Sequence, residues 1–93
     1  MTVLSPEEHV LAQRGHDDRR PEAWAVIRAV ASERLLSAFW VIGPSRSQAA
    51  VAARDAVALI LRDRGFTMRQ IGLALHRDHS TIVAAIKRAE KRK

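Results

Sequence analysis

Residues 67–92 of this chain read TMRQIGLALHRDHSTIVAAIKRAEKR, and this stretch decides the fold. Thr67 followed three residues later by Gln70 is a capping-box pattern, which predicts that a helix starts here. Apolar residues then recur at helical spacing in two groups, separated by a polar break at residues 76–78. The first group is Met68, Ile71 and Leu75, and the second is Ile82, Ala85, Ile86 and Ala89. Two short helices joined by a tight turn predict a helix-turn-helix at about residues 67–91.

Single residues shape this motif further. Gly72 lies inside the first short helix, where glycine costs about 1 kcal/mol relative to alanine. We expect its missing side chain to permit a close approach to the long helix that precedes the motif. The second short helix is expected to be capped by Asp78 or His79.

A helix is expected over residues 21–42, before the motif. Pro21 suits the first helical positions and Gly43-Pro44 ends the helix, which either runs unbroken or bends near Ser37. Its apolar face is expected to contain Trp24, Ile27, Val30, Ala31, Leu35, Phe39 and Ile42. The stretch 39–42 is apolar all round, which indicates either a buried helix end or a surface for a partner.

A second helix is expected from Ser45 to about Arg64, where Gly65 ends it. Its apolar side is expected to contain Ala50, Val51, Val57, Ala58, Ile60 and Leu61. Its polar side is expected to contain Arg46, Arg54, Asp55, Arg62 and Asp63. No segment alternates between apolar and polar residues as a strand does. The predicted fold class is therefore all-α, a compact helical domain with a C-terminal helix-turn-helix.

Residues 1–20 carry a weaker helical signal. Ser5, Pro6 and Glu8 fit the start of a helix, and Gly15 fits its end. We expect a short docked helix or a separate arm here, and the helical domain itself at residues 21–93.

The 93 residues have room for one domain, and their charge is unevenly distributed. Residues 1–44 hold five arginines against six acidic residues, a net charge of −1. Residues 45–93 hold eleven lysines and arginines against four acidic residues, a net charge of +7. The basic half contains the helix-turn-helix, as expected when one face meets a polyanion, although a solvated basic surface has the same composition.

Composition and motifs also argue against several classes of protein. The sequence has no cysteine, so it has neither disulfides nor a thiolate zinc site. No apolar run reaches ~18 residues, and the N-terminus lacks the pattern of a signal peptide. His76 and His79 have no further cluster of metal ligands near them in sequence, and no nucleophile–base pair is evident. We expect a cytoplasmic protein with no metal, no cofactor and no enzymatic activity.

The second short helix opens with side chains that suit the edges of DNA bases, and the start of this helix lies in the major groove in helix-turn-helix proteins. A carboxylate accepts a hydrogen bond from cytosine, hydroxyls bond to several base edges, and apolar groups contact the thymine methyl. The exposed candidates are Asp78, His79, Ser80, Thr81 and Val83. Lys87, Arg88 and Lys91 follow one to three turns later, where they suit phosphate groups.

The run RDHSTIVAAI at residues 77–86 resembles the signature of the C-terminal DNA-binding domain of DnaA-type bacterial replication initiators. That family typically shows Gly-Arg-Asp-His-Thr-Thr-Val at this place. Ile71-Gly72 resembles the Ile-Gly of the family's first motif helix, and the segments 46–47 and 51–54 resemble its arginine-containing loop and the start of its long helix. The resemblance covers about residues 45–90 and implies an all-α fold with an initiator- or Trp-repressor-like helix-turn-helix.

The resemblance also implies roles for single residues. The positions that would contact bases in the major groove are Asp78, His79, Ser80 and Val83. Arg46 would enter the adjacent minor groove, and its alternative role is that of an ordinary exposed residue at a helix start. Those that would hold phosphates are Arg77, Thr81 and Arg62. Arg54 lies eight residues before Arg62 on nearly the same helix face, which suits either a phosphate contact or a solvated stripe.

The sequence departs from the family pattern at four positions. Ser80 replaces a threonine, Ala84 replaces a histidine, and Ala53 replaces a common proline. His76 stands where the family has a glycine-like turn residue, and the turn is one residue shorter. These changes bear on the DNA sequence that is recognised. Nothing in the chain resembles a Walker phosphate loop, so we expect a stand-alone DNA reader without ATPase activity.

We therefore expect a sequence-specific double-stranded DNA-binding protein that recognises initiator-type boxes and regulates the initiation of replication. A replication initiator protein is a candidate second partner. The expected state is a monomer or weak dimer, associated with the nucleoid of a bacterium or with phage DNA.

Two alternatives stay open. A small helix-turn-helix transcriptional repressor would bind as a dimer, with half-sites about one helical turn apart. A protein-interaction module would use the helix at residues 22–42 to dock on an initiator or clamp protein. Its anchors would be Phe39, Trp40 and Ile42.

Overall fold

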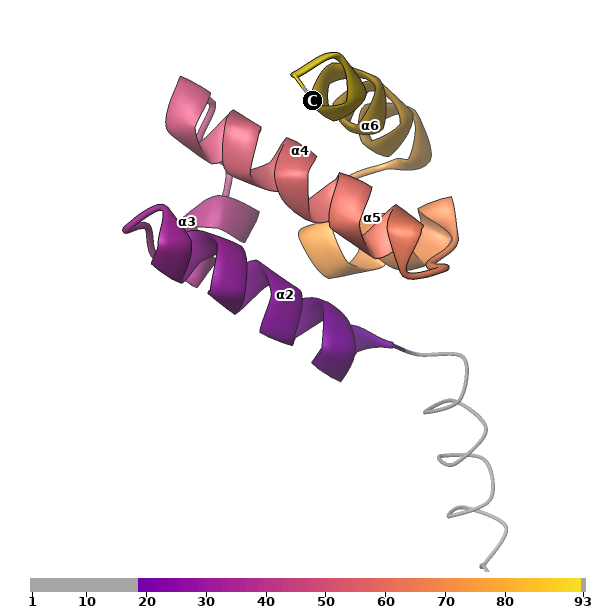
Figure 1. Cartoon of the computed structure of the whole chain (residues 1–93), viewed down its shortest axis with the longest axis horizontal. Coiled ribbons are helices and arrows are strands. Elements are labelled where there is room, and N and C mark those ends of the chain that lie inside the picture. Colours follow the sequence, from indigo (N-terminus) through magenta and orange to yellow (C-terminus); the bar gives the residue numbers. More distant parts are fainter. Residues whose placement is uncertain (1–18, 93) are drawn as a thin grey trace, which may run out of the picture.

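The computed structural model describes residues 19–92, and this part of the chain folds into five α-helices without a strand. The helices are α2 (Arg20–Glu33), α3 (Ala38–Ile42), α4 (Gln48–Asp63), α5 (Met68–Leu75) and α6 (His79–Arg92). Figure 1 shows α4 in the middle of the domain, between α2 on one side and α6 on the other. The predicted all-α fold is confirmed. The short helix or arm predicted for residues 1–20 lies outside the described residues, except that Arg20 already begins α2.

The predicted helix at residues 21–42 is interrupted, and α2 and α3 are separate. Leu35 takes a left-handed conformation with φ of 59°, which ends α2. The amide of Leu36 donates to the carbonyl of Ala31 at 2.7 Å, the hydrogen bond that closes a Schellman motif. The Ser37 hydroxyl then caps α3 by accepting from the amide of Trp40.

This interruption changes which apolar residues are buried. The predicted apolar face of residues 21–42 is correct for Ile27, Val30 and Ala31, which are all in the core. It is wrong for Leu35, which is 93% exposed, and for Phe39, which is 74% exposed. After the left-handed residue the chain turns, so the side chain that α3 buries fully is Val41.

The long helix α4 begins later than predicted. Ser47 caps it, with its hydroxyl accepting from the amide of Ala50 at 3.2 Å, so residues 43–47 form a loop. The predicted helical start at Ser45 is therefore wrong. The end of the helix is as predicted, because Gly65 takes a φ of 87° that places the chain for α5.

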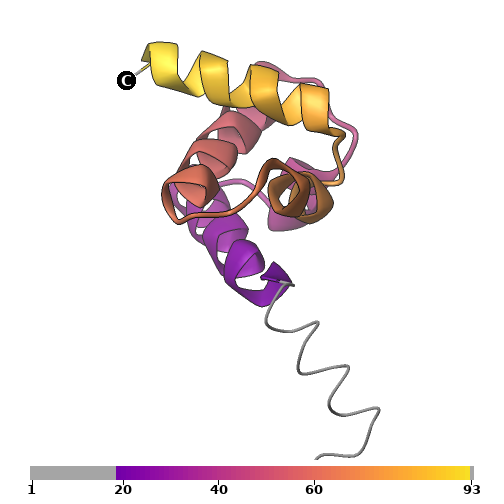
Figure 2. The same cartoon turned by 90° about the vertical axis from the view of Figure 1, so that its right-hand side faces the viewer.

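The helix-turn-helix is formed by α5 and α6, as the sequence predicted. Thr67 and Gln70 make both hydrogen bonds of the capping box, at 2.9 and 3.1 Å. His76 ends α5 in the left-handed conformation with φ of 56°. The Asp78 carboxylate accepts from the amide of Thr81 at 2.9 Å, which makes Asp78 the cap of α6. Figure 2 shows α6 from the side, with α5 seen end-on below the start of α6.

Gly72 permits a close approach, but to a different element than expected. A Cβ atom at this position would lie 2.6 Å from the carbonyl oxygen of Arg77, in the turn between α5 and α6. The amide of Arg77 donates to the carbonyl of Gly72 at 2.9 Å, so turn and helix are joined here. The expected approach to the long helix α4 is therefore wrong. Glycine is required by the helix-turn-helix turn itself.

The core lies around α4 and is built mostly from aliphatic side chains of α2, α4, α5 and α6. The four predicted inward residues of α6, namely Ile82, Ala85, Ile86 and Ala89, are all buried. Two charged residues of α4 are buried as well: Arg54 is 8% exposed and Asp55 is 1% exposed. The prediction that both belong to a polar face is wrong, and their partners on other elements explain why.

Candidate nucleic-acid interface

The outward face of α6 lies opposite its buried stripe. Residues spaced three or four apart share a face of a helix. Four residues share the outward face at this spacing: Ser80, Ala84, Lys87 and Lys91. All are exposed except Ala84, which is half-buried, and Val83 beside it is half-buried too. This face has a hydroxyl and small apolar groups near the start of the helix and two ammonium groups towards its end. The first set suits contacts with base edges and the second suits contacts with phosphate groups.

The start of α6 is organised by Asp78. Its carboxylate accepts from the Thr81 amide at 2.9 Å and from the Ser80 hydroxyl at 3.2 Å. Hydrogen bonds from the Thr81 hydroxyl and amide lower the pKa of Asp78, so the cap is ionised at neutral pH. Asp78 and His79 are exposed, as the predicted base contacts require, but Asp78 has a structural task besides. It holds the side chain of Ser80 at the surface where α6 would enter a groove.

The side of α6 that faces α4 carries an ion network around Asp55. Arg88 donates to both oxygens of this carboxylate at 3.0 and 3.1 Å, and Arg92 donates to one of them at 2.7 Å. These hydrogen bonds raise the pKa of Arg88. The guanidinium of Arg88, predicted as a phosphate contact, is therefore bonded within the domain. The network joins the C-terminal half of the recognition helix to α4.

Arg62 is also engaged within the domain. Its guanidinium pairs with the carboxylate of Glu90 on α6 and with that of Asp63 at 3.2 Å. These hydrogen bonds raise the pKa of Arg62. By contrast, Lys87 and Lys91 are exposed and have no ion-pair partner among residues 19–92. The cations of α6 that are available for phosphate groups are therefore these two lysines.

Arg54 and Arg77 both point towards the segment that joins α3 to α4. The Arg54 guanidinium donates to the carbonyls of Val41 at 2.8 Å and Gly43 at 3.3 Å, and also to that of Ser45. Burial, together with the nearby charge of Arg77, lowers the pKa of Arg54. Arg77 donates to the carbonyl of Gly43 at 2.6 Å. Both side chains, predicted as phosphate contacts, are therefore bonded to backbone carbonyls within the domain.

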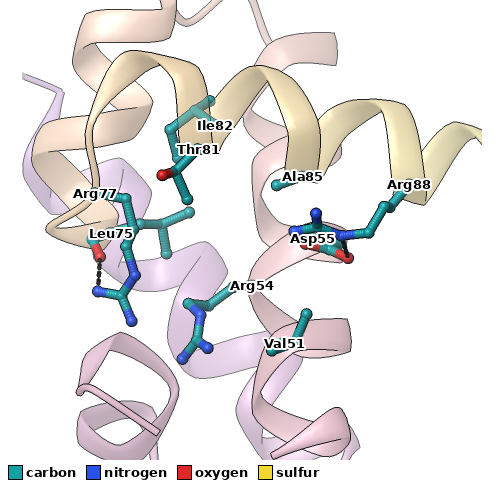
Figure 3. Close-up of a pocket in the computed structure, with 9 residues that line it drawn as sticks. All are labelled: Val51, Arg54, Asp55, Leu75, Arg77, Thr81, Ile82, Ala85 and Arg88. Carbon is teal, nitrogen blue, oxygen red and sulfur yellow. Dashed lines mark hydrogen bonds and ion pairs between the residues drawn. The ribbon is translucent and has the colours of Figure 1, made fainter. Parts of the chain in front are cut away.

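These two arginines line a small pocket of about 140 Å³ between α4 and the helix-turn-helix. Figure 3 shows both side chains extending away from α6, while Arg88 and Asp55 meet on the other side of the pocket. Thr81 also lines the pocket and is exposed.

Arg46 lies on the 43–47 loop, at the end of the segment that Arg54 and Arg77 hold. It is exposed and has no ion-pair partner among residues 19–92. The loop is shaped locally by Ser45 and Ser47, because the Ser45 hydroxyl accepts from the Ser47 amide at 3.3 Å. A cationic side chain thus projects from a short fixed loop next to the helix-turn-helix.

Sequence reasoning missed the buried role of Arg54 and Asp55, although a signal was present. Arg54 follows Ala50 by four residues and precedes Val57 by three, and Asp55 stands in the same relation to Val51 and Ala58. Both therefore lie inside the apolar stripe of α4. Charged residues in such a stripe indicate partners on other elements.

Within the described part of the chain, no cluster of three or more His, Cys, Asp or Glu side chains could hold a metal ion. Across residues 19–92 no helix is both long and apolar enough to cross a bilayer.

A recognition helix with an outward polar and basic face, set across a capped first helix, defines a helix-turn-helix DNA-binding domain. Residues 24–89 match the family model described as the bacterial dnaA protein helix-turn-helix, and the chain belongs to this family. Neither a curated protein nor a solved structure matched the chain. The protein thus carries a DnaA-type helix-turn-helix, a module that binds double-stranded DNA.

Proposed function

We propose that this domain recognises an initiator-type box in double-stranded DNA through two grooves at once, and that it regulates the initiation of replication. The start of α6 occupies the major groove, and Arg46 enters the adjacent minor groove. The observation that carries this proposal is that the seven arginines and lysines predicted from the sequence to contact DNA fall into two sets. Arg54, Arg62, Arg77 and Arg88 are bonded within the domain, whereas Arg46, Lys87 and Lys91 are exposed and without ion-pair partners among residues 19–92.

The roles of the exposed residues follow from their chemistry. His79 and Ser80 offer hydrogen-bonding groups to base edges, and Val83 offers an apolar surface to a thymine methyl. Lys87 and Lys91 contact phosphates further along the groove. The Thr81 hydroxyl donates to Asp78 in the free domain and becomes a further phosphate donor when it turns away from this carboxylate. Asp78 orders this surface as the cap of α6 and is the acceptor that suits cytosine.

Two of these assignments predict a loss of specificity. We expect Arg46→Ala and His79→Ala each to weaken binding to the preferred box by roughly 1–3 kcal/mol and to relax discrimination against other sequences. The box is the sequence that the wild-type protein enriches from a pool of random duplexes, and affinities are measured by fluorescence anisotropy. Lys91→Ala is the matched control, because loss of a phosphate contact weakens binding to all sequences alike. If Arg46→Ala left both specific and nonspecific affinity unchanged, the minor-groove assignment would be wrong.

A second candidate function is docking on a replication protein. Leu35 and Phe39 expose most of their apolar side chains, and Trp40 beside them is 38% exposed. Of the anchors expected for such a module, Ile42 is half-buried and contributes less. Binding to an initiator that survives the substitution of Lys87 and Lys91 by alanine would favour this function over DNA recognition.

A further inference from the structure

We propose that Arg54 and Arg77 are positioning residues for DNA recognition: they fix the loop that carries Arg46 at a set place relative to the recognition helix. This inference rests on the proposed function, since it concerns how Arg46 in the minor groove is kept at a fixed distance from α6 in the major groove. It gives both arginines a role that differs from the phosphate contact expected from the sequence.

The first observation is where the guanidinium groups donate. Val41, Ile42, Gly43 and Ser45 all present carbonyls to one or both of these side chains. Arg54 reaches this segment from the middle of α4, and Arg77 reaches it from the turn between α5 and α6. Two cations from different parts of the chain therefore converge on the few residues directly before Arg46.

The second observation is that Arg77 bonds to two elements at once. The same Nη1 atom that donates to Ile42 at 3.3 Å also donates to the carbonyls of Leu75 and His76, both at 3.1 Å. One guanidinium thus joins the end of α5 to the end of α3. Since α6 begins two residues after Arg77, the loop and the recognition helix are tied to a common point.

The third observation is that the loop has few bonds of its own. Residues 43–47 lie between two helices, and the Ser47 carbonyl accepts from the Val51 amide of α4 at 2.9 Å. The carbonyls of Gly43 and Ser45 lie outside both helices and need other donors. The guanidinium groups supply donors for them. Holding two cations close together is unfavourable, and the lowered pKa of Arg54 reflects both its burial and the charge of Arg77. The carbonyl oxygens offset the repulsion between the two guanidinium groups only when the loop has the observed shape. The two side chains therefore stabilise this shape over other loop conformations.

The test is a double-mutant cycle with Arg46. Arg54→Lys and Arg77→Lys keep the charge and remove the planar fork that reaches several carbonyls. We expect each to weaken binding to the preferred box by about tenfold and to leave binding to an unrelated duplex within about twofold. In an Arg46→Ala background the same substitutions should change box affinity by less than about twofold, because the loop then has no groove contact to position. Arg28→Lys, on the exposed surface of α2, is the matched control and should change nothing.

Two outcomes would overturn the proposal. Equal losses in the wild-type and Arg46→Ala backgrounds would indicate a general structural role. Parallel losses for the box and the unrelated duplex would indicate direct phosphate contacts. Thermal unfolding of each variant identifies any that fails to fold, and the half-buried Arg77 provides the second test if Arg54→Lys is unfolded. Failure of the proposed function is distinguishable, because the wild-type protein would then not prefer the box at all.

Discussion

The Gly72→Ala variant is expected to lose about 3 kcal/mol of unfolding free energy. At an open position inside a helix the same change would stabilise the protein by about 1 kcal/mol, since alanine is the better helix former. Here the added Cβ would lie 2.6 Å from the carbonyl oxygen of Arg77, a distance that real Cβ contacts do not show. The opposing atom belongs to the backbone of a turn that is held by the 2.9 Å hydrogen bond from Arg77 to Gly72. No side chain can rotate to relieve the contact.

Chemical denaturation of Gly72→Ala and wild type measures this effect. The neighbouring variant Ala74→Gly serves as the control for helix propensity, with an expected loss of about 1 kcal/mol. A variant Gly72→Ala that is as stable as the wild type would show that the turn adapts at little cost. The close approach would then not be what requires glycine in the helix-turn-helix.

The double variant Arg88→Met/Arg92→Met is expected to lose about 3–5 kcal/mol of unfolding free energy. The reason is an asymmetry of burial. The side chain of Asp55 is 1% exposed, whereas Arg88 and Arg92 are each about half exposed. Removing both arginines leaves a carboxylate inside the domain without the two partners that neutralise it. Each single substitution should be milder, because the other arginine still bonds to Asp55.

Adding Asp55→Leu to the double variant tests this explanation. The whole network is then replaced by apolar groups, which is often neutral or stabilising, so most of the lost stability should return. A double variant as stable as the wild type in chemical denaturation would contradict this explanation, because it would mean that water reaches Asp55. If the triple variant stayed unstable, the loss would come from the packing of the arginine methylene groups and not from an unpaired Asp55 carboxylate.

The helix-turn-helix was predictable because its signals are local. Thr67 and Gln70 are three residues apart, and the apolar stripe of α6 repeats every three or four residues. The family resemblance rests on the same stretch. The break after α2 could not be predicted in this way, since a left-handed Leu35 occupies a place where glycine is the usual signal. Ser37 near the break was visible, but it fits a bend as well as a cap.

The site was predictable in its exposed part and not in its buried part. His79, Ser80, Lys87 and Lys91 lie at the surface of α6 as expected, although their contacts with DNA stay predictions. The partners of Arg54 and Arg88 depend on contacts between residues far apart in the chain. Asp55 and Arg88, for example, are 33 residues apart in sequence and meet only because α4 packs on α6. A basic residue near a helix-turn-helix therefore predicts either a phosphate contact or a hydrogen-bonded contact within the domain. Only the three-dimensional structure distinguishes the two.

One titration tests most directly whether this domain distinguishes between DNA sequences. The wild-type protein is titrated with a duplex that carries its preferred initiator-type box and with a scrambled duplex of the same composition, each at two salt concentrations. We predict binding to the box that is about 1,000-fold tighter, with both affinities falling as salt rises because phosphate contacts contribute to each. Equal affinity for the two duplexes at both salt concentrations would contradict sequence recognition.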